Sequence, residues 1–256
     1  MDLILNTHLG ESYKSNSQKV RVITEDWVAQ NMFCPRCGHK MLSHYSANKP
    51  VADFYCEQCN SDFELKSQER NHDISNKIVD GAYSTMIERI NSLNNPNLLV
   101  MTYHDWRVTN FIFIPNHLFT CDVIERRKPL SPTAKRAGWV GCNILIDKIP
   151  ESGKIYIVKN SLKTDIQTVM DKFKIVTGLQ TNNLDARGWI LDILKCIEIL
   201  PEDDFCLKDV YQFEDLLHEK HPTNNFIKDK IRQQLQILRD KGFIEFTSRG
   251  NYRKLI

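Results

Sequence analysis

Asp53, Glu64 and Lys66 are the residues whose types and spacing point most directly to chemistry, in the order D-x10-E-x-K. Two carboxylates can hold a divalent cation through their oxygens. An ammonium beside them can orient or deprotonate a water and stabilise negative charge on a phosphate. Because E-x-K is also common as surface charge on solvated strands, the three residues acquire meaning only from their context.

The stretch Val51 to Gln68 has the pattern of a β-hairpin. Its first strand carries Asp53, and its second strand carries Glu64 and Lys66 between apolar residues. Alternation places the acid and the amine of the second strand on one face, where Asp53 can join them. This order of acid, acid and lysine resembles the PD-(D/E)XK nucleases, although alanine stands before Asp53 where they usually have proline.

Two C-x2-C pairs separated by 18 residues predict a structural zinc site. The predicted ligands are Cys34, Cys37, Cys56 and Cys59. Four thiolates complete a tetrahedral shell and leave no position for water or substrate, so we expect the nearby His39 and His44 to be surface or packing residues. Four buried free thiols are the alternative. Since the second pair lies between Asp53 and Glu64, the metal would hold the hairpin rigid.

The composition favours a folded, non-membrane protein. The chain has 256 residues, 41% of them hydrophobic, and a net charge of +2, so a nucleic-acid signal has to be local. It has neither an apolar run long enough for a membrane span nor a secretory signal at its N-terminus. With two C-x2-C pairs present, eight cysteines indicate metal rather than disulfides. We therefore expect a cytoplasmic protein.

Hydrophobic periodicity predicts an α/β domain around the hairpin. The predicted helices are residues 18–30, 74–92 and 165–176, and the predicted strands outside the hairpin are residues 41–45, 98–103, 111–114 and 155–158. From the N-terminus the order is helix, three strands, helix, strand. This order resembles the PD-(D/E)XK core, with the two acids on its second and third strands.

Residues 125–143 form a predicted basic loop that is rich in turn residues and holds Trp139 between two glycines. Its basic residues are Arg126, Arg127, Lys128, Lys135 and Arg136. Cations beside an exposed aromatic ring suit contact with a nucleic-acid backbone and a base. A solvated loop anchored by one tryptophan is the alternative.

The pattern changes after a predicted linker at residues 178–184, so we expect two domains, residues 1–180 and 181–256. Predicted helices at residues 189–200, 207–219 and 224–241 precede a hairpin formed by residues 243–246 and 252–256. The residues of the third helix that we expect to face inward are Phe226, Ile227, Ile231, Leu235 and Leu238. Three helices followed by a hairpin are typical of a winged-helix domain.

The charge of this second domain favours DNA as its partner. From Asn224 onward, eight basic residues stand against three acidic ones, a local net charge of +5. The predicted DNA contacts are Lys228, Arg232, Arg239 and Arg249. A helix of this kind fits the major groove, and an Arg-Gly wing can touch the backbone or the minor groove. Winged helices also bind proteins, and a charged face can be merely solvated.

Six segments resemble the DpnI-type methyl-directed restriction endonucleases, and the resemblance covers essentially the whole chain. They are YKSNSQKVRVITEDWV, PVADFYCEQC, FELKS, PLSPTAKRAGWVGCNI, KIRQQLQILRDKGFIEF and RGNYRKL. The resemblance implies a PD-(D/E)XK domain with an inserted four-cysteine zinc site and a C-terminal winged helix. It implies a type II enzyme that cuts double-stranded DNA at GATC when the adenine carries an N6-methyl group.

The resemblance also implies catalytic roles for Asp53, Glu64 and Lys66 and zinc ligation by the four cysteines. Asp53, Glu64 and the carbonyl of Leu65 would hold Mg²⁺, and Gln68 would add an outer contact. Lys66 would position the attacking water or stabilise charge in the transition state. We expect methylated double-stranded DNA as the partner, bound by a monomer.

The methyl group on adenine adds apolar surface in the major groove. A pocket lined by Trp139 would favour it by about 1 kcal/mol, and both domains would read the methylated site. A zinc-containing winged-helix regulator without catalysis is the alternative function, and a nuclease for RNA or damaged DNA is the third. The regulator has no need of Asp53, Glu64 and Lys66 together, so their arrangement separates the first two hypotheses.

Overall fold

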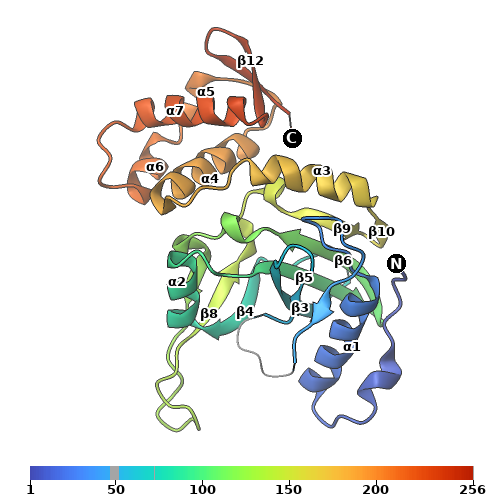
Figure 1. Cartoon of the computed structure of the whole chain (residues 1–256). Helices are drawn as coiled ribbons and strands as arrows, with labels where there is room; N and C mark the ends of the chain where they lie inside the picture. Colours follow the sequence, from blue (N-terminus) through green and yellow to red (C-terminus); the bar gives the residue numbers. More distant parts are fainter. Residues whose placement is uncertain (47–51, 72, 256) are drawn as a thin grey trace.

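The computed structural model describes residues 1–46, 52–71 and 73–255 (Figure 1). Val51, at the start of the predicted hairpin, and Ile256, at the end of the C-terminal hairpin, lie outside the described residues. Two sheets with their helices make up the N-terminal region, and a mainly helical region follows it. The prediction of a mixed α/β fold is therefore confirmed.

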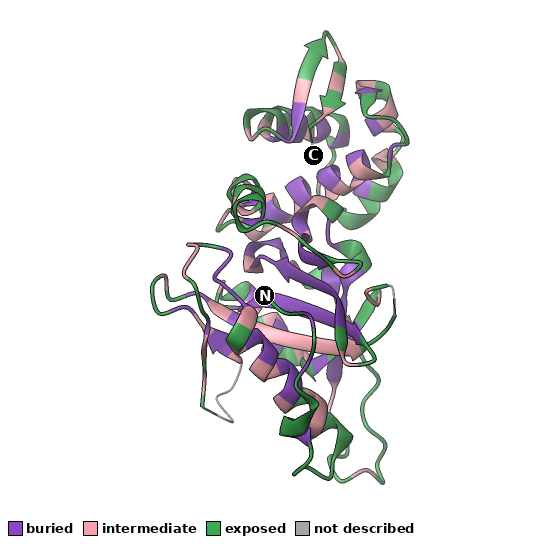
Figure 2. Cartoon of the chain, turned by 90° about the vertical axis from the view of Figure 1, so that its right-hand side faces the viewer, coloured by how far each residue is buried: buried purple, intermediate pink, exposed green. Residues whose placement is uncertain are grey.

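The central sheet has seven strands in the order β1-β2-β3-β5-β6-β9-β10. Among the described strands, β3 and β5 pair in parallel and the other neighbours pair antiparallel. The strands are β1 (Ser43–His44), β2 (Phe54–Tyr55), β3 (Asp62–Glu69), β5 (Asn97–His104), β6 (Arg107–Ile114), β9 (Ile155–Lys159) and β10 (Leu162–Lys163). Within this sheet the buried residues are concentrated along β5, β6 and β9, whereas β3 is mostly half-buried (Figure 2).

Two helices pack on this sheet through aromatic side chains. α1 (Asn16–Asn31) places Trp27 edge-on against Phe111 of β6, with ring centroids 5.3 Å apart. α3 (Ile166–Thr177) places Phe173 with its ring centroid 5.6 Å from that of Phe113 on the same strand. The apolar residues whose spacing predicts the two helices therefore lie on the face that each helix turns toward the sheet. In the described part of the chain, no helix is both long and apolar enough to cross a membrane.

The prediction of a single helix at residues 74–92 is wrong in its first half. Residues 77–82 form β4 (Lys77–Ala82), and the helix is α2 (Tyr83–Asn91). β4 pairs with β8 (Gly141–Leu145), which pairs with β7 (Ile124–Arg126) in a second sheet. Along β4, Ile78 and Asp80 are buried between exposed neighbours. This repeat of two fits a strand, and pairing with a distant strand selects it over the helical repeat.

The C-terminal region contains α4 (Leu184–Ile199), α5 (Leu207–Tyr211), α6 (Glu214–Lys220), α7 (Ile227–Asp240) and the antiparallel sheet of β11 (Asp204–Cys206), β13 (Asn251–Lys254) and β12 (Ile244–Ser248). α4 begins earlier than predicted because the Asn183 side chain caps it, accepting the N–H of Ala186 at 2.9 Å. The helix predicted at residues 207–219 is broken into α5 and α6. Phe226 does not face inward, because it precedes α7 and is 70% exposed.

α4 connects the C-terminal region to the sheet region through hydrogen bonds. The buried Arg187 donates to the carbonyl oxygens of Phe119 at 3.2 Å and Thr181 at 2.9 Å. Glu198, on the same helix, accepts the backbone N–H groups of Glu151 and Ser152. The connection therefore consists of specific hydrogen bonds in addition to the short segment 178–183 between α3 and α4.

Candidate functional site

The two C-x2-C pairs fold into matching turns. In each turn the carbonyl of the first cysteine accepts an N–H at 2.9 Å, from Gly38 to Cys34 and from Asn60 to Cys56. Gly38 and Asn60 have φ angles of 76° and 54°, a left-handed conformation that glycine and asparagine tolerate best. The local sequence after each pair is therefore suited to the same tight reversal of the chain.

These turns bring four thiols into one cluster. The Sγ atoms of Cys34 and Cys59 are 3.6 Å apart, those of Cys37 and Cys56 are 3.5 Å apart, and all four lie within 4.8 Å of one another. Zinc with four Zn–S bonds of ~2.3 Å separates its sulfurs by roughly 3.8 Å. The cluster fits a structural zinc site. His44 lies outside this cluster, and its Nε2 is 3.0 Å from Oε2 of Glu25.

Asp53 lies at the open end of the hairpin, one residue before β2 rather than on the predicted strand. Its N–H donates to the carbonyl of Phe63 at 2.9 Å, and its Oδ2 accepts the N–H of Leu65 at 2.7 Å. A strand residue directs its N–H and C=O toward the same edge, so the Leu65 carbonyl also points to the Asp53 side. The carboxylate and this carbonyl are thereby brought to one edge of β3.

Lys66 lies between two carboxylates. Its Nζ is 2.6 Å from Oε1 of Glu64, on the same strand, and 2.5 Å from Oδ1 of Asp80, on β4. The Asp80 side chain is 4% exposed, and its Oδ2 has no hydrogen-bond partner among the described residues. Asp80 is absent from the predicted site because a helix at residues 74–92 gives no reason to bring it to β3. The sequence of β4 carries no signal that could have found it, because the exposed Val79 is apolar and the buried Asp80 is charged, the reverse of the usual alternation.

Burial and charge shift the protonation equilibria of these groups. Burial raises the pKa of Glu64 to about 7, with Lys66 opposing and Asp80 adding to the shift. Burial also raises the pKa of Asp53, against the hydrogen bond from Leu65. Burial lowers the pKa of Lys66, but Glu64 and Asp80 outweigh it and hold that pKa above its ordinary value. Lys66 is therefore a cation at neutral pH, and the carboxylates are poorly solvated.

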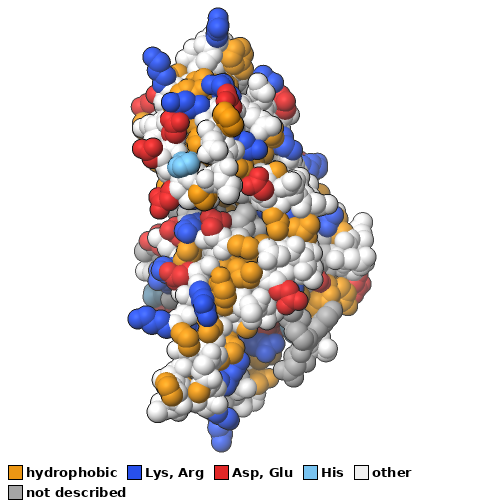
Figure 3. Space-filling view, turned by 90° about the vertical axis from the view of Figure 1, so that its left-hand side faces the viewer, with side chains coloured by type: hydrophobic (Ala, Val, Ile, Leu, Met, Phe, Trp, Pro, Cys, Tyr) orange, Lys and Arg blue, Asp and Glu red, His pale blue; other side chains and the backbone are white. Residues whose placement is uncertain are grey.

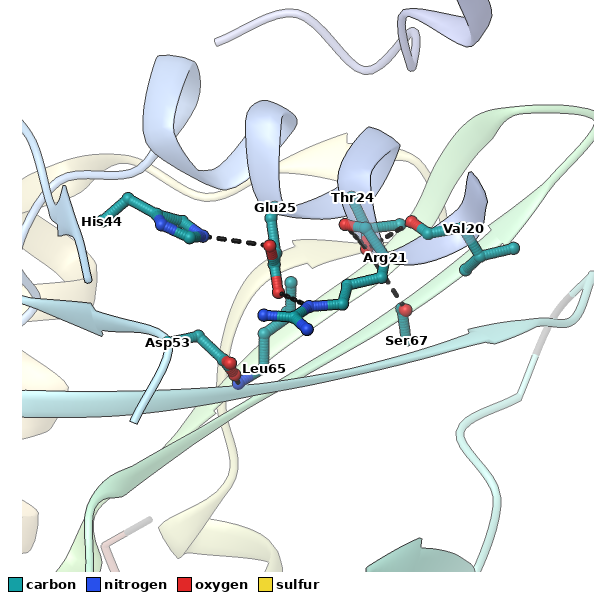
Figure 4. Close-up of polar contacts among 8 residues, drawn as sticks. All are labelled: Val20, Arg21, Thr24, Glu25, His44, Asp53, Leu65 and Ser67. Atoms are coloured by element: carbon teal, nitrogen blue, oxygen red, sulfur yellow. Dashed lines mark hydrogen bonds and ion pairs between the residues drawn. The ribbon is translucent and has the colours of Figure 1, made fainter. Parts of the chain in front are cut away.

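A pocket of about 540 Å³ opens beside these groups. Its lining includes the three predicted catalytic residues together with Arg21 and Glu25 of α1. Glu25 Oε1 lies 2.6 Å from Arg21 Nε, and its other oxygen bonds His44. Figure 4 shows Arg21 and Glu25 on the face of α1 turned toward Asp53, with His44 of β1 reaching Glu25 from the side. The helix thus closes one side of the pocket with a paired charge cluster.

The pocket also offers the oxygen donors that a hard cation requires. Gln68 lines it, and its buried Oε1 has no hydrogen-bond partner among the described residues. The carboxylates of Asp53 and Glu64 and the edge carbonyl of Leu65 are oxygen ligands of the kind that Mg²⁺ takes. Buried acceptors without partners are uncommon, and an ion or its water shell would satisfy them. The residues present therefore fit a divalent cation.

The basic loop connects β7 to β8 and projects from the body of the molecule (Figure 1). Its base is closed by the bonds from Arg127 N–H to the Gly141 carbonyl at 3.0 Å and from Leu130 N–H to the Trp139 carbonyl at 2.9 Å. The basic residues predicted to contact DNA are all exposed: Arg126, Arg127, Lys135 and Arg136. Trp139 is half-buried rather than exposed, because its ring lies against Gly141 and under Arg136, 4.6 Å from the Cζ atom.

The predicted DNA contacts of the C-terminal region are also exposed: Lys228, Arg232, Arg239 and Arg249. Lys228 pairs with Glu214 at 2.9 Å, and Arg239 pairs with Asp240 at 2.7 Å. Figure 3 shows Lys and Arg side chains spread along one face of the molecule and interspersed with acids. Exposed pairs of this kind are weak, so these cations can exchange their partners for phosphates.

Two family models match the chain. A model of the Dam-replacing family, DpnI, matches residues 1–182, and a model of the Dam-replacing HTH domain matches residues 185–254. The first match includes the cysteine cluster and the acid-lined pocket, and the second includes α7. A helix-turn-helix domain implies binding to DNA. The chain therefore belongs to the Dam-replacing family of DpnI-type methyl-directed endonucleases.

Proposed function

We propose that this protein is a Mg²⁺-dependent type II restriction endonuclease that hydrolyses phosphodiester bonds of double-stranded DNA at GATC sites containing N6-methyladenine. Its family supports a methyl-directed restriction function. The observation that carries the catalytic part is the convergence of Asp53, Glu64 and Lys66 on one pocket. The order α1, β1, β2, β3, β4, α2, β5, in which β4 belongs to the second sheet, supports assigning the seven-stranded sheet to the PD-(D/E)XK core.

In this proposal Asp53, Glu64 and the carbonyl of Leu65 hold Mg²⁺, and Gln68 contributes an outer contact. The bound metal supplies a Lewis acid that polarises the phosphate and lowers the pKa of a water. Asp53 is positioned for this role by its bond to the Leu65 N–H. The four-cysteine zinc site holds the hairpin that joins Asp53 to Glu64, so it supports the catalytic residues without taking part in the reaction.

Lys66 acts as a cation rather than as a general base. Its ammonium is held protonated by Glu64 and Asp80, so it can donate hydrogen bonds but cannot accept a proton at neutral pH. In the proposed reaction it orients the attacking water or stabilises the negative charge that develops on the phosphate oxygens. A preorganised donor in a site shielded from water is worth several kcal/mol to a transition state.

DNA is read by two surfaces in this proposal, one in each proposed domain (residues 1–180 and 181–256). The loop between β7 and β8 offers exposed cations and the ring of Trp139 near the pocket, since β8 pairs with the strand that carries Asp80. α7 and the wing offer a second set of cations to the backbone and grooves. The ring of Trp139 would contact the adenine methyl group, and one chain would bind one site.

The decisive experiment is digestion of one plasmid in two forms, with and without N6-methyladenine at its GATC sites. In Mg²⁺ buffer the methylated form should be cut at GATC and the unmethylated form left intact. Lys66→Ala and a reaction with excess chelator serve as controls, and neither should cut. Equal cutting of both plasmids would show that cleavage does not require the methyl group.

A binding assay with the same two DNAs distinguishes the proposed nuclease from the alternative, a DNA-binding regulator. If wild-type protein binds the duplexes but cuts neither in Mg²⁺ or Mn²⁺, the zinc-containing regulator without catalysis replaces this proposal. Cutting of RNA, or of damaged DNA in preference to methylated GATC, would keep the catalytic residues and change the substrate.

A further inference from the structure

Asp80 contacts the centre of the candidate active site from a different sheet. Its Oδ1 accepts the Lys66 ammonium at 2.5 Å and also the N–H of Gly81 at 2.7 Å. Its side chain is 4% exposed, whereas its Oδ2 has no hydrogen-bond partner among the described residues. A buried carboxylate with an unpaired oxygen costs stability, so its presence at this place needs a reason beyond packing.

The ammonium of Lys66 is shared by two acids that belong to different strands. Glu64 and Lys66 lie on β3 of the seven-stranded sheet, while Asp80 lies on β4 of the small sheet. Both contacts are short, at 2.6 Å and 2.5 Å. With Asp53 at the same pocket, three acidic side chains stand against one ammonium, an excess of acid that a divalent cation would balance.

Glu64 cannot accept a hydrogen bond from Lys66 and bind a metal equally well at the same time. An oxygen that binds a cation is a weaker acceptor for a neighbouring ammonium, and the two positive charges repel each other. Without a second acid, metal binding by Glu64 would leave Lys66 as a largely buried ammonium beside another cation, which is strongly unfavourable. Asp80 is placed to remain as the partner of Lys66.

We propose that Asp80 is a positioning residue that keeps the Lys66 ammonium in place when Glu64 turns to a divalent cation, and that its charge strengthens cation binding at this pocket. The inference rests on the proposed function, because it assigns Glu64 to the metal. It adds a residue to that site and a reason for the second carboxylate next to Lys66. Asp80 acts through Lys66 and through charge, without touching the substrate.

The first test measures metal binding without DNA. Mn²⁺ is titrated by calorimetry into zinc-loaded wild type, Asp80→Asn and Asp171→Asn. Asparagine keeps the shape of the side chain and an oxygen that can accept the Gly81 N–H. Asp171→Asn is the matched control, since it removes one acid from an exposed ion pair with Lys174 on α3. Asp80→Asn should bind Mn²⁺ roughly 10- to 100-fold more weakly, as for other residues that support metal ligands, and the control should match wild type.

The second test separates positioning from general damage to the fold. At saturating Mn²⁺ and methylated DNA, Asp80→Asn should cut roughly 10- to 100-fold more slowly, with KM for DNA and the melting temperature close to those of wild type. A variant that equals wild type in both Mn²⁺ affinity and kcat would overturn the proposal. If wild type itself cuts no DNA, the proposed function fails, whereas the calorimetry still decides the role of Asp80.

A third measurement covers the case in which Asp80→Asn does not fold. The metal-free stabilities of Lys66→Met and of Lys66→Met/Asp80→Asn are then compared. If Asp80 balances the Lys66 charge, the double variant should be at least as stable as Lys66→Met, because the uncompensated buried carboxylate is gone. A double variant much less stable than Lys66→Met would show that the Asp80 carboxylate stabilises the fold independently of the Lys66 charge, and would overturn the proposal.

Discussion

The pocket beside β3 and the exposed face of α7 both carry cations next to acids, but their surroundings differ. In the pocket, the side chains of Lys66 and Asp80 are 20% and 4% exposed. On α7, those of Arg239 and Asp240 are 45% and 63% exposed. The first pair lies among packed strands and the second is in water, so the two pairs interact with very different strength.

This difference separates residues that act on a reacting group from residues that attract a polyanion. A buried ammonium with fixed partners has one position, which is what stabilisation of a transition state requires. An exposed arginine can change partners readily, which is what binding a long phosphate backbone requires. Substitutions in the pocket should therefore change kcat, and substitutions on α7 should change affinity and its dependence on salt.

The largest expected effect is on cleavage by Lys66→Ala and Asp53→Ala. Each should abolish cutting of methylated DNA, a loss on the order of 10³-fold, because it removes a charge from the reacting centre. DNA affinity in a mobility-shift assay should stay close to that of wild type, since the recognition surfaces lie elsewhere. Lys174→Ala on α3 removes an exposed lysine as the control. Normal cleavage by Lys66→Ala would remove that residue from the mechanism.

Loss of the metal cluster should have the next largest effect. Cys56→Ser should lower the zinc content from about one per chain and destabilise the hairpin, since structural zinc contributes folding free energy directly. Activity should fall with it, because Asp53 and Glu64 lose their mutual placement. Elemental analysis and thermal unfolding measure both effects, with Cys121→Ser, an exposed thiol outside the cluster, as the control. A folded, active protein without zinc would contradict the zinc prediction.

The comparison of buried with exposed groups also applies to histidines, through the dependence of stability on pH. His117 is 5% exposed and bonded to the carbonyl of Val176, and burial lowers its pKa to about 4. The unfolded chain takes up this proton near pH 6.5 and the folded chain does not, so stability falls as the pH falls from 6.5 toward 4. Between pH 7.5 and 5 the contribution of His117 to this loss should be about 2 kcal/mol, while the raised pKa of Glu64 acts in the opposite direction.

Urea unfolding at the two pH values tests this prediction. His117→Gln should lose less stability than wild type over that interval, because its side chain does not titrate. His218→Gln, on the exposed surface of α6, is the control and should lose as much as wild type. Equal losses in wild type and His117→Gln would show that His117 does not account for the pH dependence.

The smallest effects are expected on α7. Arg232→Ala and Arg239→Ala should weaken binding of the full chain to methylated duplexes by about 1 kcal/mol each and slow cutting at low enzyme concentration. The slope of log affinity against log salt should become shallower by about 1, because one phosphate contact is lost. Thermal stability should stay within about 0.5 kcal/mol, since both side chains are exposed. Unchanged affinity in both variants would favour a protein-contact role for this helix.

Much of the fold could be predicted from local pattern, and the errors have local causes. The helix at α1, the strands at β5, β6 and β9 and the C-terminal hairpin follow from apolar periodicity and turn residues. Apolar periodicity predicts a helix in place of β4, because Ile78 fits the helical repeat and the strand that decides against it, β8, is far along the chain. β7 and β11, with three residues each, carry too few residues for a periodic signal.

The candidate site could also be predicted only in part, because local pattern indicates some of its residues and contacts between distant segments decide the others. Cysteine spacing alone indicates the metal cluster, because each C-x2-C pair forms its own turn and Gly38 and Asn60 follow the pairs at equivalent positions. Asp53 and Glu64 could be placed together because one hairpin carries both. The half-buried state of Trp139 was missed, since it depends on how the loop folds back on Gly141.

The sequence by itself determined what neighbours along the chain can specify: the thiol pairs, the acids and the lysine of one hairpin, and the basic helix. Only the tertiary structure decided which charges meet across elements. Asp80 joins Lys66 because β4 is held by β8 in a second sheet, and Glu25 faces the pocket because α1 packs on β3. Such contacts depend on packing between segments distant in the chain, for which local spacing carries no signal.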